Sequence, residues 1–246
     1  MDIMQDERID DLQYKGLKLI QKKSGFCFGI DAVLLADFTE VKKNASVIDL
    51  GTGTGIIAIL LAGRSEAREI VGLEIQEEMC EMAGRSVKLN GLEERVRIVN
   101  GDIKNAPEIF GRSSFDVVVT NPPYTKHGGG LVNPCDMKAV SRHEILCTLE
   151  DIIRTSGSLL KPGGQLSMVN RPERTADVLC LMRKYGIEPK FMRLVHPQPY
   201  KKANLILVRG IRGARPYFKI LEPLYVYNPD GSYTDEINRI YHREKV

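Results

Sequence analysis

The sequence predicts an α/β fold, with a mostly parallel sheet that is covered by helices on both faces. Short apolar runs with the length of strands alternate with segments of helical length from residue 47 to residue 208. Several of these runs end in a polar residue that is followed by glycine or proline, as at a tight turn. The 246 residues, 43% of them hydrophobic, are enough for one large core. Because strands joined through helices run parallel, ligands are expected at the carboxyl ends of the strands, around the switch point of the sheet.

The alternation predicts seven strands and five helices. The strands are expected at residues 47–50, 69–74, 96–100, 115–120, 165–169, 191–195 and 204–208. The helices are expected at residues 32–38, 56–62, 77–89 (ended by Asn90-Gly91), 144–156 and 173–185. We divide the chain into a hairpin-and-helix leader (1–44), a main domain (45–210) and a C-terminal extension packed on the same domain (211–246).

The leader is short and has its own pattern. Residues 17–20 and 26–28 are apolar runs on either side of a turn that contains Gly25, which predicts a hairpin. Asp31 is expected to be the N-cap of the helix that follows, because a short side-chain oxygen can accept a hydrogen bond from the first helical turn.

The composition excludes several classes of protein. The formal net charge of +3 is too small to indicate nucleic-acid binding by itself. No apolar run approaches 18 residues, and the acidic start of the chain differs from the basic start of a secretory signal. Five cysteines without a Cys-x-x-Cys pair indicate neither a disulfide framework nor a zinc site, and the four histidines lack metal-ligand spacing. We therefore expect a soluble, cytoplasmic protein without a metal.

A glycine-rich turn follows the first predicted core strand. The run from Val47 ends in Asp49 and Leu50, and Gly51, Gly53 and Gly55 alternate before the next helix. Glycine permits a left-handed backbone and the close approach of a ligand. The Gly-x-Gly-x-Gly spacing differs from the Gly-x-Gly-x-x-Gly of dinucleotide folds, so a nucleoside without a pyrophosphate is expected. The alternative is a tight strand-to-helix turn that binds nothing.

Polar residues follow three further predicted strands. Glu74 closes the second strand, 19 residues beyond Gly55, about where an acid accepts hydrogen bonds from the two hydroxyls of a ribose. Asp102 and Asn121 follow the third and fourth strands. Each has a simpler alternative: Glu74 as a solvated strand end, Asp102 as a helix N-cap and Asn121 as an Asx turn. Together they predict a binding site beside the glycine turn.

The tetrapeptide Asn121-Pro122-Pro123-Tyr124 indicates chemistry on an amino group. Proline after a strand fixes the backbone, so the Pro122 carbonyl and the Asn121 side-chain oxygen can converge on one point. Two acceptors there would hold both hydrogens of an exocyclic amino group and favour the pyramidal nitrogen, whose lone pair can attack an electrophile. Tyr124 would stack on a planar base, or else be a core aromatic.

Basic residues gather near the C-terminal end of the chain. Eight lysines and arginines lie between Lys190 and Lys219, without an acidic residue among them. We take this run, with Lys201 and Lys202 as substrate-binding residues, as a candidate RNA-binding surface; the alternative is a solvated surface without a partner. The leader adds further candidate cations at Lys15, Lys18, Lys22 and Lys23.

These residues resemble the class I S-adenosylmethionine methyltransferases, and Asn121 to Tyr124 is the mark of their amino-methylating branch. The resemblance runs from Val47 to Val208. It implies a Rossmann-like fold with a seven-stranded sheet and S-adenosyl-L-methionine as the cofactor. The implied catalytic residues are Asn121, Pro122 and Tyr124.

The same resemblance implies which residues contact the cofactor. Asp49 and the glycine turn would hold the methionine part, and Glu74 the ribose. Asp102 would bind the adenine amino group, with Ile103 against the adenine face. The full implied set is Asp31, Asp49, Gly51, Gly53, Gly55, Glu74, Ile75, Asp102, Ile103 and Asn121.

A narrower resemblance covers almost the whole chain. Residues 28–36, 141–144 and 223–234 look like the bacterial tRNA (adenine-N6) methyltransferases that act on the anticodon loop of a valine tRNA. It implies methylation of adenine N6 in tRNA, an RNA partner, no membrane, and a monomer or weak homodimer. Thr125 follows Tyr124 where such relatives often have a second aromatic, which bears on how the base stacks.

Other functions stay open at this point. The tetrapeptide also occurs in enzymes that methylate a glutamine amide of release factors, but those have a larger helical domain before the first core strand, and here 46 residues precede Val47. A DNA adenine methyltransferase would have a large target-recognition segment. A nucleic-acid-binding or scaffold protein could keep the cofactor without catalysis. A dehydrogenase is disfavoured by the glycine spacing.

Overall fold

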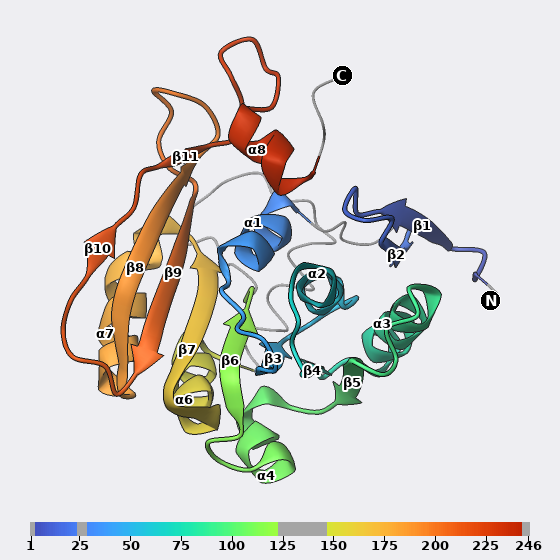
Figure 1. The fold of residues 1–246 in the computed structure, drawn as a ribbon, viewed down its shortest axis with the longest axis horizontal. Coiled ribbons are helices and arrows are strands. Elements are labelled where there is room, and N and C mark those ends of the chain that lie inside the picture. Colours follow the sequence, from blue (N-terminus) through green and yellow to red (C-terminus); the bar gives the residue numbers. More distant parts are fainter. Residues whose placement is uncertain (1–2, 24–28, 123–146, 243–246) are drawn as a thin grey trace.

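A nine-stranded sheet forms the centre of the molecule in the computed structural model, which describes residues 3–23, 29–122 and 147–242 (Figure 1). The strand order is β10-β8-β9-β7-β6-β3-β4-β5, and β11 also pairs with β8. The strands are β3 (Ser46–Leu50), β4 (Glu69–Glu74), β5 (Val96–Asn100), β6 (Phe115–Thr120), β7 (Leu160–Asn170), β8 (Ile187–His196), β9 (Leu205–Arg212), β10 (Lys219–Ile220) and β11 (Leu224–Tyr225). The α/β prediction is confirmed: the seven expected strands are present, and two two-residue strands extend the sheet.

Most neighbouring strands run parallel. β3 lies between β4 and β6, β4 pairs with β5, and β6 with β7, all in parallel register. β9 is antiparallel to both β7 and β8. The carboxyl ends of β3 to β8 therefore lie along one edge of the sheet, called here the carboxyl edge. The chain reverses direction across the sheet between β3 and β6, which makes this the switch point.

Helices cover both faces, and the alternation of side chains in the strands explains why. Val47 and Ile48 are neighbours in β3, yet they belong to different buried clusters on opposite faces. Helices of one face contribute to the first cluster and those of the other face to the second (Figure 1). They are α1 (Ile30–Phe38), α2 (Ile56–Arg64), α3 (Glu77–Leu89) and α8 (Asp235–Ile240), then α4 (Ala106–Phe110), α6 (Leu149–Leu159) and α7 (Thr175–Lys184).

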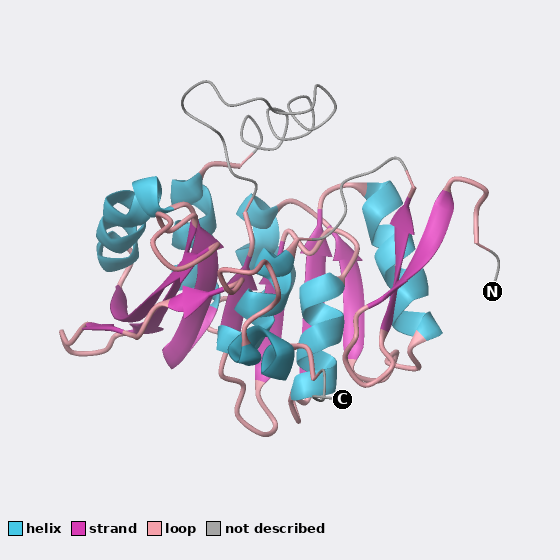
Figure 2. Cartoon of the chain, turned by 90° about the horizontal axis from the view of Figure 1, so that it is seen from above, coloured by secondary structure: helices cyan, strands magenta, loops and turns pink. Residues whose placement is uncertain are grey.

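The N-terminal hairpin differs from its prediction. The expected strand at 17–20 is found as β2 (Lys18–Lys22), but its antiparallel partner is β1 (Glu7–Asp11), which precedes it. Residues 26–28 lie outside the described part of the chain. In the turn between them, Gly16 and the non-glycine residues Gln13 and Lys15 have left-handed φ angles. Figure 2 shows this two-stranded sheet apart from the central sheet, beside α3.

The start of α1 also differs from its prediction. Gly29 is the N-cap, and Asp31 lies inside the first turn. The Asp31 carboxylate accepts a hydrogen bond from the Ala32 backbone and another from Asn121, so it does not cap the helix. The division into leader, main domain and extension stays a prediction. Among the residues described here, no helix is both long and apolar enough to cross a membrane.

Candidate active site

The glycine turn lies at the end of β3, where the backbone must leave the sheet at once and enter α2. Gly51, Gly53 and Gly55 all have left-handed φ angles, of 73°, 57° and 87°. The Gly51 and Thr52 amides donate to the Leu73 carbonyl at 2.9 and 3.0 Å, which anchors the turn to β4. A Cβ at Gly55 would lie 3.3 Å from the Ala83 Cβ, whereas one at Gly53 would meet no described atom within 4 Å. Gly55 therefore serves packing, and Gly53 borders open space.

Glu74 joins the turn to the end of the neighbouring strand. Its side chain is buried, and its Oε2 accepts the Gly53 N–H at 3.0 Å while Oε1 accepts the Gln76 N–H at 3.0 Å. The carboxylate is thereby fixed in position beside the turn. Each of its oxygens has a second lone pair, so the group keeps the capacity to accept hydrogen bonds from a ligand.

Asp49 is the most buried acid of the site. Its Oδ2 accepts the Thr52 hydroxyl at 2.6 Å, but Oδ1 has no partner with hydrogen-bonding geometry among the described residues. Burial, and secondarily the charge of Glu74, raise the pKa of Asp49 to about 7, against the opposing effect of the Thr52 hydroxyl and, less strongly, of the Ala58 backbone amide. A buried acceptor without a partner costs about 1–3 kcal/mol. A positively charged ligand beside the turn would favour its ionised form.

The end of β5 supplies a second acid and an apolar side chain. Asp102 accepts the Lys104 N–H at 2.8 Å, so it caps the short 3₁₀ helix Ile103–Asn105 and still borders the site half-buried. Ile103 lies opposite the turn, since its Cδ1 would be 3.9 Å from a Cβ at Gly51. Ile75 follows Glu74 and is exposed. Two apolar side chains, Ile75 and Ile103, thus follow the ends of the neighbouring strands β4 and β5.

Asn121 follows β6 across the switch point from the glycine turn. Its Nδ2 donates to Asp31 Oδ2 at 3.1 Å. Because an ionised carboxylate only accepts, this bond fixes which end of the amide faces Asp31, and the acceptor Oδ1 lies at the other end. The Thr120 hydroxyl donates to the Leu50 carbonyl at 3.0 Å and ties β6 to the turn. Pro122 is buried, and Pro123 and Tyr124 lie outside the described residues.

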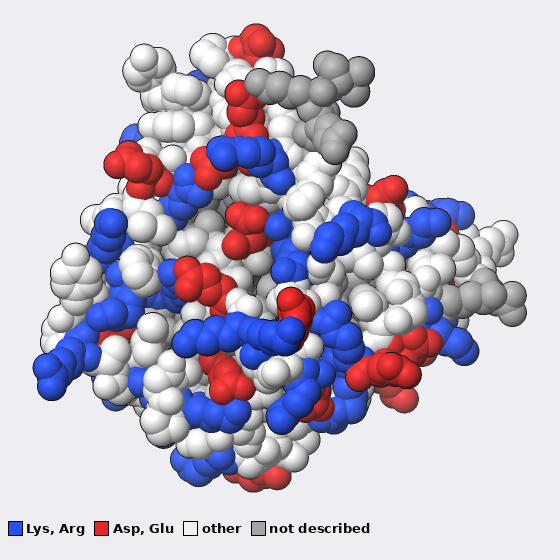
Figure 3. Space-filling model, in the orientation of Figure 1, with Lys and Arg blue, Asp and Glu red and all other residues white. Residues whose placement is uncertain are grey.

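The basic run does not form one uniform surface. Arg193 makes two hydrogen bonds to Glu236, of 2.7 and 2.9 Å, and Arg209 pairs with Glu40 at 2.6 Å. In the leader, Lys22 pairs with Glu78. On the face drawn in Figure 3, basic and acidic side chains lie interspersed. Arg193, Arg209 and Lys22 are thus paired with acids of the same molecule, which leaves fewer cations for a candidate RNA-binding surface.

Lys201 and Lys202 remain exposed, in the loop between β8 and β9. This loop lies on the carboxyl edge, on the side of β7 away from the glycine turn. The structure thus brings together the glycine turn, Glu74, Asp102 and Asn121 on one edge, with the two lysines farther along it. Asp31 was expected at the cofactor, but its contact with Asn121 has no sequence signal, because the residues are 90 positions apart. Within the described ranges, no group of three or more His, Cys, Asp or Glu side chains is placed to hold a metal ion.

The parallel sheet, with a glycine turn and acids at the carboxyl ends of its strands, is the architecture of α/β enzymes that bind a nucleoside-containing cofactor. The family model of the methyltransferase small domain matches residues 28–186, and the chain belongs to this family. Its cofactor is S-adenosyl-L-methionine.

Similar proteins cover nearly the whole chain. A tRNA1(Val) (adenine(37)-N6)-methyltransferase of Porphyromonas gingivalis is 28% identical over 239 residues, covering 94% of this chain and 93% of that protein. One of Aeromonas hydrophila with the same name is 27% identical and covers 84% of this chain and 85% of its own. A predicted O-methyltransferase of Agrobacterium tumefaciens has a similar structure, with a TM-score of 0.71, 25% identity and coverage of 86% and 95%. TYW2 of P. horikoshii, solved in complex with MeSAdo, shares the fold at a TM-score of 0.60 and 16% identity, with coverage of 86% and 73%.

Proposed function

We propose that this enzyme transfers a methyl group from S-adenosyl-L-methionine to N6 of an adenine in tRNA, in the cytoplasm. The observation that carries the proposal is the amide of Asn121, held by Asp31 at the end of β6, across the switch point from the glycine turn. The names of the relatives, which align with this chain over most of its length, support tRNA and adenine as the substrate.

The residues of the carboxyl edge fit the parts of the cofactor. The open space at Gly53 and the acid at Asp49 suit the positively charged methionine end. Glu74, which the Gly53 and Gln76 amides hold in position, would accept hydrogen bonds from the ribose, and Ile75 follows it in the chain. Asp102 and Ile103 would bind the adenine, by its amino group and its face. The bound cofactor supplies a methyl group on a positively charged sulfur.

Asn121 and Pro122 would act on the substrate adenine. Oδ1 of Asn121 and the Pro122 carbonyl would each accept one N–H of the amino group, which holds the nitrogen and frees its lone pair. The cofactor, held by the glycine turn and Glu74, would supply the methyl group that this lone pair attacks. The methylated nitrogen is then acidic and releases its proton to water, so a strong base is not required. Asp31 would act as a positioning residue by holding the amide, and Tyr124 would stack on the base.

Mass spectrometry of nucleosides tests this proposal. Total tRNA would be prepared from cells with and without the gene, and the purified enzyme would be added back to the tRNA that lacks the modification. We expect N6-methyladenosine to be lost without the gene and restored by the enzyme. An unchanged tRNA profile, together with loss of methylglutamine from a release factor, would show instead that the substrate is a protein.

A further inference from the structure

The loop between β8 and β9 places an aromatic side chain and two lysines on the same edge as the active site. β7 and β8 are both antiparallel to β9 and so run in the same direction. The loop after β8 therefore leaves the sheet at the carboxyl edge, where the chain also passes from β3 into the glycine turn and from β6 to Asn121. Figure 1 shows this loop beside β11 and the C-terminal part of the chain.

Tyr200 is the most unusual residue of this loop. Its side chain is fully exposed, at 104% of the reference area, and its φ angle of 67° is left-handed. A bulky residue rarely adopts this conformation, which glycine or asparagine would fill without strain. Neither packing nor backbone geometry explains a tyrosine here. Strained and exposed aromatic residues are typical of binding sites.

The rest of the loop holds this tip in a fixed position. His196 Nδ1 lies 2.7 Å from the Lys201 carbonyl oxygen, and the Asn204 amide donates to the Val195 carbonyl at 3.0 Å. The C-terminal segment adds a second support, since the Tyr227 amide donates to the Pro197 carbonyl at 2.8 Å. A tip that is already ordered loses little conformational freedom when it binds.

The charged residues within the loop itself are all basic. Lys201 and Lys202 directly follow Tyr200, and no acidic residue occurs between Glu188 and Glu222. Within the part of the chain that the structure describes, neither lysine side chain has a hydrogen-bond or ion-pair partner, in contrast to Arg193 and Arg209. An exposed ring beside two unpaired cations matches single-stranded RNA, because bases stack on the ring while phosphates contact the cations.

We infer that the loop of residues 197–204 is an RNA-docking element, in which Tyr200 stacks on an unpaired base near the target adenine and Lys201 and Lys202 contact the adjoining phosphates. The inference rests on the proposed function, because it takes tRNA as the substrate. It adds a specific contact at a distance from the reacting atoms. Removing this contact should weaken RNA binding without affecting either the cofactor or the methyl transfer step.

Substitutions at the tip separate stacking from charge. We expect Tyr200→Ala to raise the Kd and KM for unmodified tRNA about tenfold, the lower part of the range for loss of one base–aromatic stack. Tyr200→Phe should bind as the parent does. Stacking releases no counterions, so the slope of log affinity against log salt should be unchanged in both variants. The Lys201→Ala/Lys202→Ala double variant should make this negative slope shallower, by up to about two units.

Tyr217 offers a matched control, since it is also exposed, at 68%, but follows β9 at the opposite edge. Tyr217→Ala should leave tRNA binding unchanged. The affinity for S-adenosylhomocysteine should stay at the parent value in all variants, which also shows that each is folded, and Tyr217→Ala should keep the parent kcat at saturating tRNA. Equal tRNA affinity in the Tyr200→Ala and parent proteins would overturn the inference, as would a Tyr200→Phe variant as weak as Tyr200→Ala. Binding and methylation are measured separately, so a parent enzyme that binds tRNA without methylating it would contradict the proposed function and leave the test of the loop intact.

Discussion

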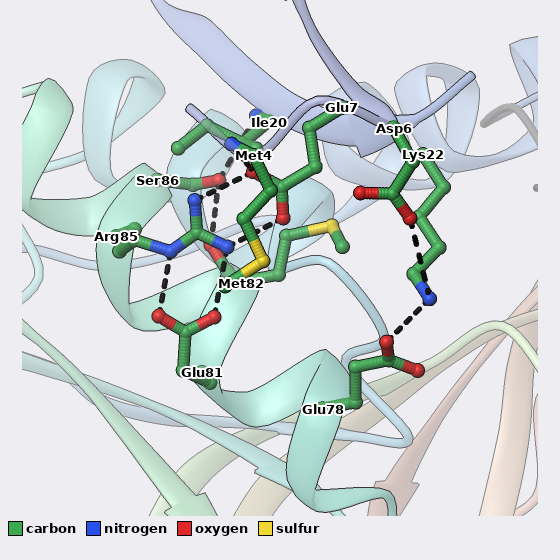
Figure 4. Close-up of polar contacts among 10 residues, drawn as sticks. All are labelled: Met4, Asp6, Glu7, Ile20, Lys22, Glu78, Glu81, Met82, Arg85 and Ser86. Atoms are coloured by element: carbon green, nitrogen blue, oxygen red, sulfur yellow. Dashed lines mark hydrogen bonds and ion pairs between the residues drawn. The ribbon is translucent and has the colours of Figure 1, made fainter. Parts of the chain in front are cut away.

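Two buried carboxylates show how differently two regions of this molecule, the N-terminal hairpin and the carboxyl edge of the sheet, are built. The side chain of Glu7 in the hairpin is 1% exposed. It accepts two hydrogen bonds from the Arg85 guanidinium, Nη2 to Oε1 at 2.5 Å and Nη1 to Oε2 at 2.7 Å (Figure 4). Asp49 of the active site is also fully buried, but one of its oxygens has no partner with hydrogen-bonding geometry among the described residues. The Arg85 hydrogen bonds, opposed by burial, lower the pKa of Glu7, whereas burial raises the pKa of Asp49 to about 7.

The difference separates stability from function. At the hairpin, polar groups pair within the protein: Arg85 also binds Glu81, and the Ile20 amide donates to the Ser86 hydroxyl at 3.0 Å (Figure 4). At the carboxyl edge, Oδ1 of Asp49 has no hydrogen-bond partner among the residues described, and Tyr200 has a left-handed backbone. Such costs are common at sites that a ligand completes. Changes at the hairpin should therefore lower stability, and changes at the carboxyl edge should lower activity without loss of stability.

The Asp49→Asn substitution should give the largest difference. A folded-state pKa raised from 3.8 to about 7 means that the folded protein binds more protons than the unfolded chain between these pH values. Its unfolding free energy therefore falls as pH rises from about 4 to 7. We expect Asp49→Asn to remove this decline and to gain about 2–4 kcal/mol at pH 8, while cofactor binding weakens.

Urea unfolding at pH 4.5 and pH 8 measures this effect. Glu66→Gln is a suitable control, because Glu66 is an exposed acid whose pair with Lys43 lies in solvent. A parent protein with the same unfolding free energy at both pH values would show that Asp49 is not protonated in the folded state at pH 4.5. The pKa values of Asp49 and Glu7 would then not be shifted in opposite directions.

Breaking the Arg85–Glu7 pair should have the next largest effect, with the opposite sign. Arg85→Ala leaves a buried carboxylate without its partner, and we expect the unfolding free energy to fall by about 2–4 kcal/mol at pH 7, since Arg85 itself is partly accessible. Because the pKa of Glu7 is lowered, the stability that it contributes in the parent is present above its unfolded pKa and is lost as pH falls through the folded pKa.

A double variant distinguishes charge from packing at this pair. Arg85→Met with Glu7→Gln removes both charges and should recover much of the stability that Arg85→Ala loses. Methyl transfer by folded protein should be unaffected in each variant. A fall in kcat at a temperature where Arg85→Ala is fully folded would show that the hairpin also takes part in catalysis.

Asn121→Ala should lower activity without lowering stability. Its oxygen acts on the amino group during transfer, so we expect kcat to fall by about 10² while the affinity for S-adenosylhomocysteine stays close to that of the parent. Asn170 at the end of β7 is a matched control, because its side chain accepts the Arg171 amide and serves the local turn. Single-turnover assays of Asn121→Ala and Asn170→Ala measure this difference; equal rates would remove the catalytic role of Asn121.

Much of the fold could be predicted because local signals mark it. The strand at 69–74 and the helix at 77–89 lie where the sequence placed them, since a carboxylate closes the first and Asn90-Gly91 the second. The helix expected at 144–156 is found as α6, which begins at Leu149, where Thr148 and Asp151 form a capping box; residues 144–146 of the expected range lie outside the described part of the chain. The capping box could be recognised in the sequence, but the polar residues at 141–144 also resemble a helix start.

In the candidate active site, the sequence could predict only the residues that follow the ends of strands. Parallel strands bring their carboxyl ends together, so Glu74 and Asn121 could be placed on one edge from the order of the strands. The Asp31–Asn121 hydrogen bond could not be predicted, because it depends on the position of α1 over the sheet. Nor could the basic run be divided into paired and unpaired cations, since Glu40 and Glu236 approach it from distant parts of the chain.

The smallest expected change in unfolding free energy is at Tyr200. It tests whether an exposed residue of the carboxyl edge, unlike the residues of the hairpin, contributes nothing to stability. Glycine adopts a φ angle of 67° without strain but has greater freedom in the unfolded chain, and these two contributions oppose each other. Since an exposed tyrosine contributes no packing, we expect Tyr200→Gly to change the unfolding free energy by less than about 1 kcal/mol, with relief of strain favouring a gain. The same variant should bind tRNA about as weakly as Tyr200→Ala, because both lack the ring. Thermal unfolding and tRNA titration of the two variants side by side measure both quantities. A clear loss of stability in Tyr200→Gly would mean that the tyrosine supports the loop, and the carboxyl edge would then resemble the hairpin in this respect.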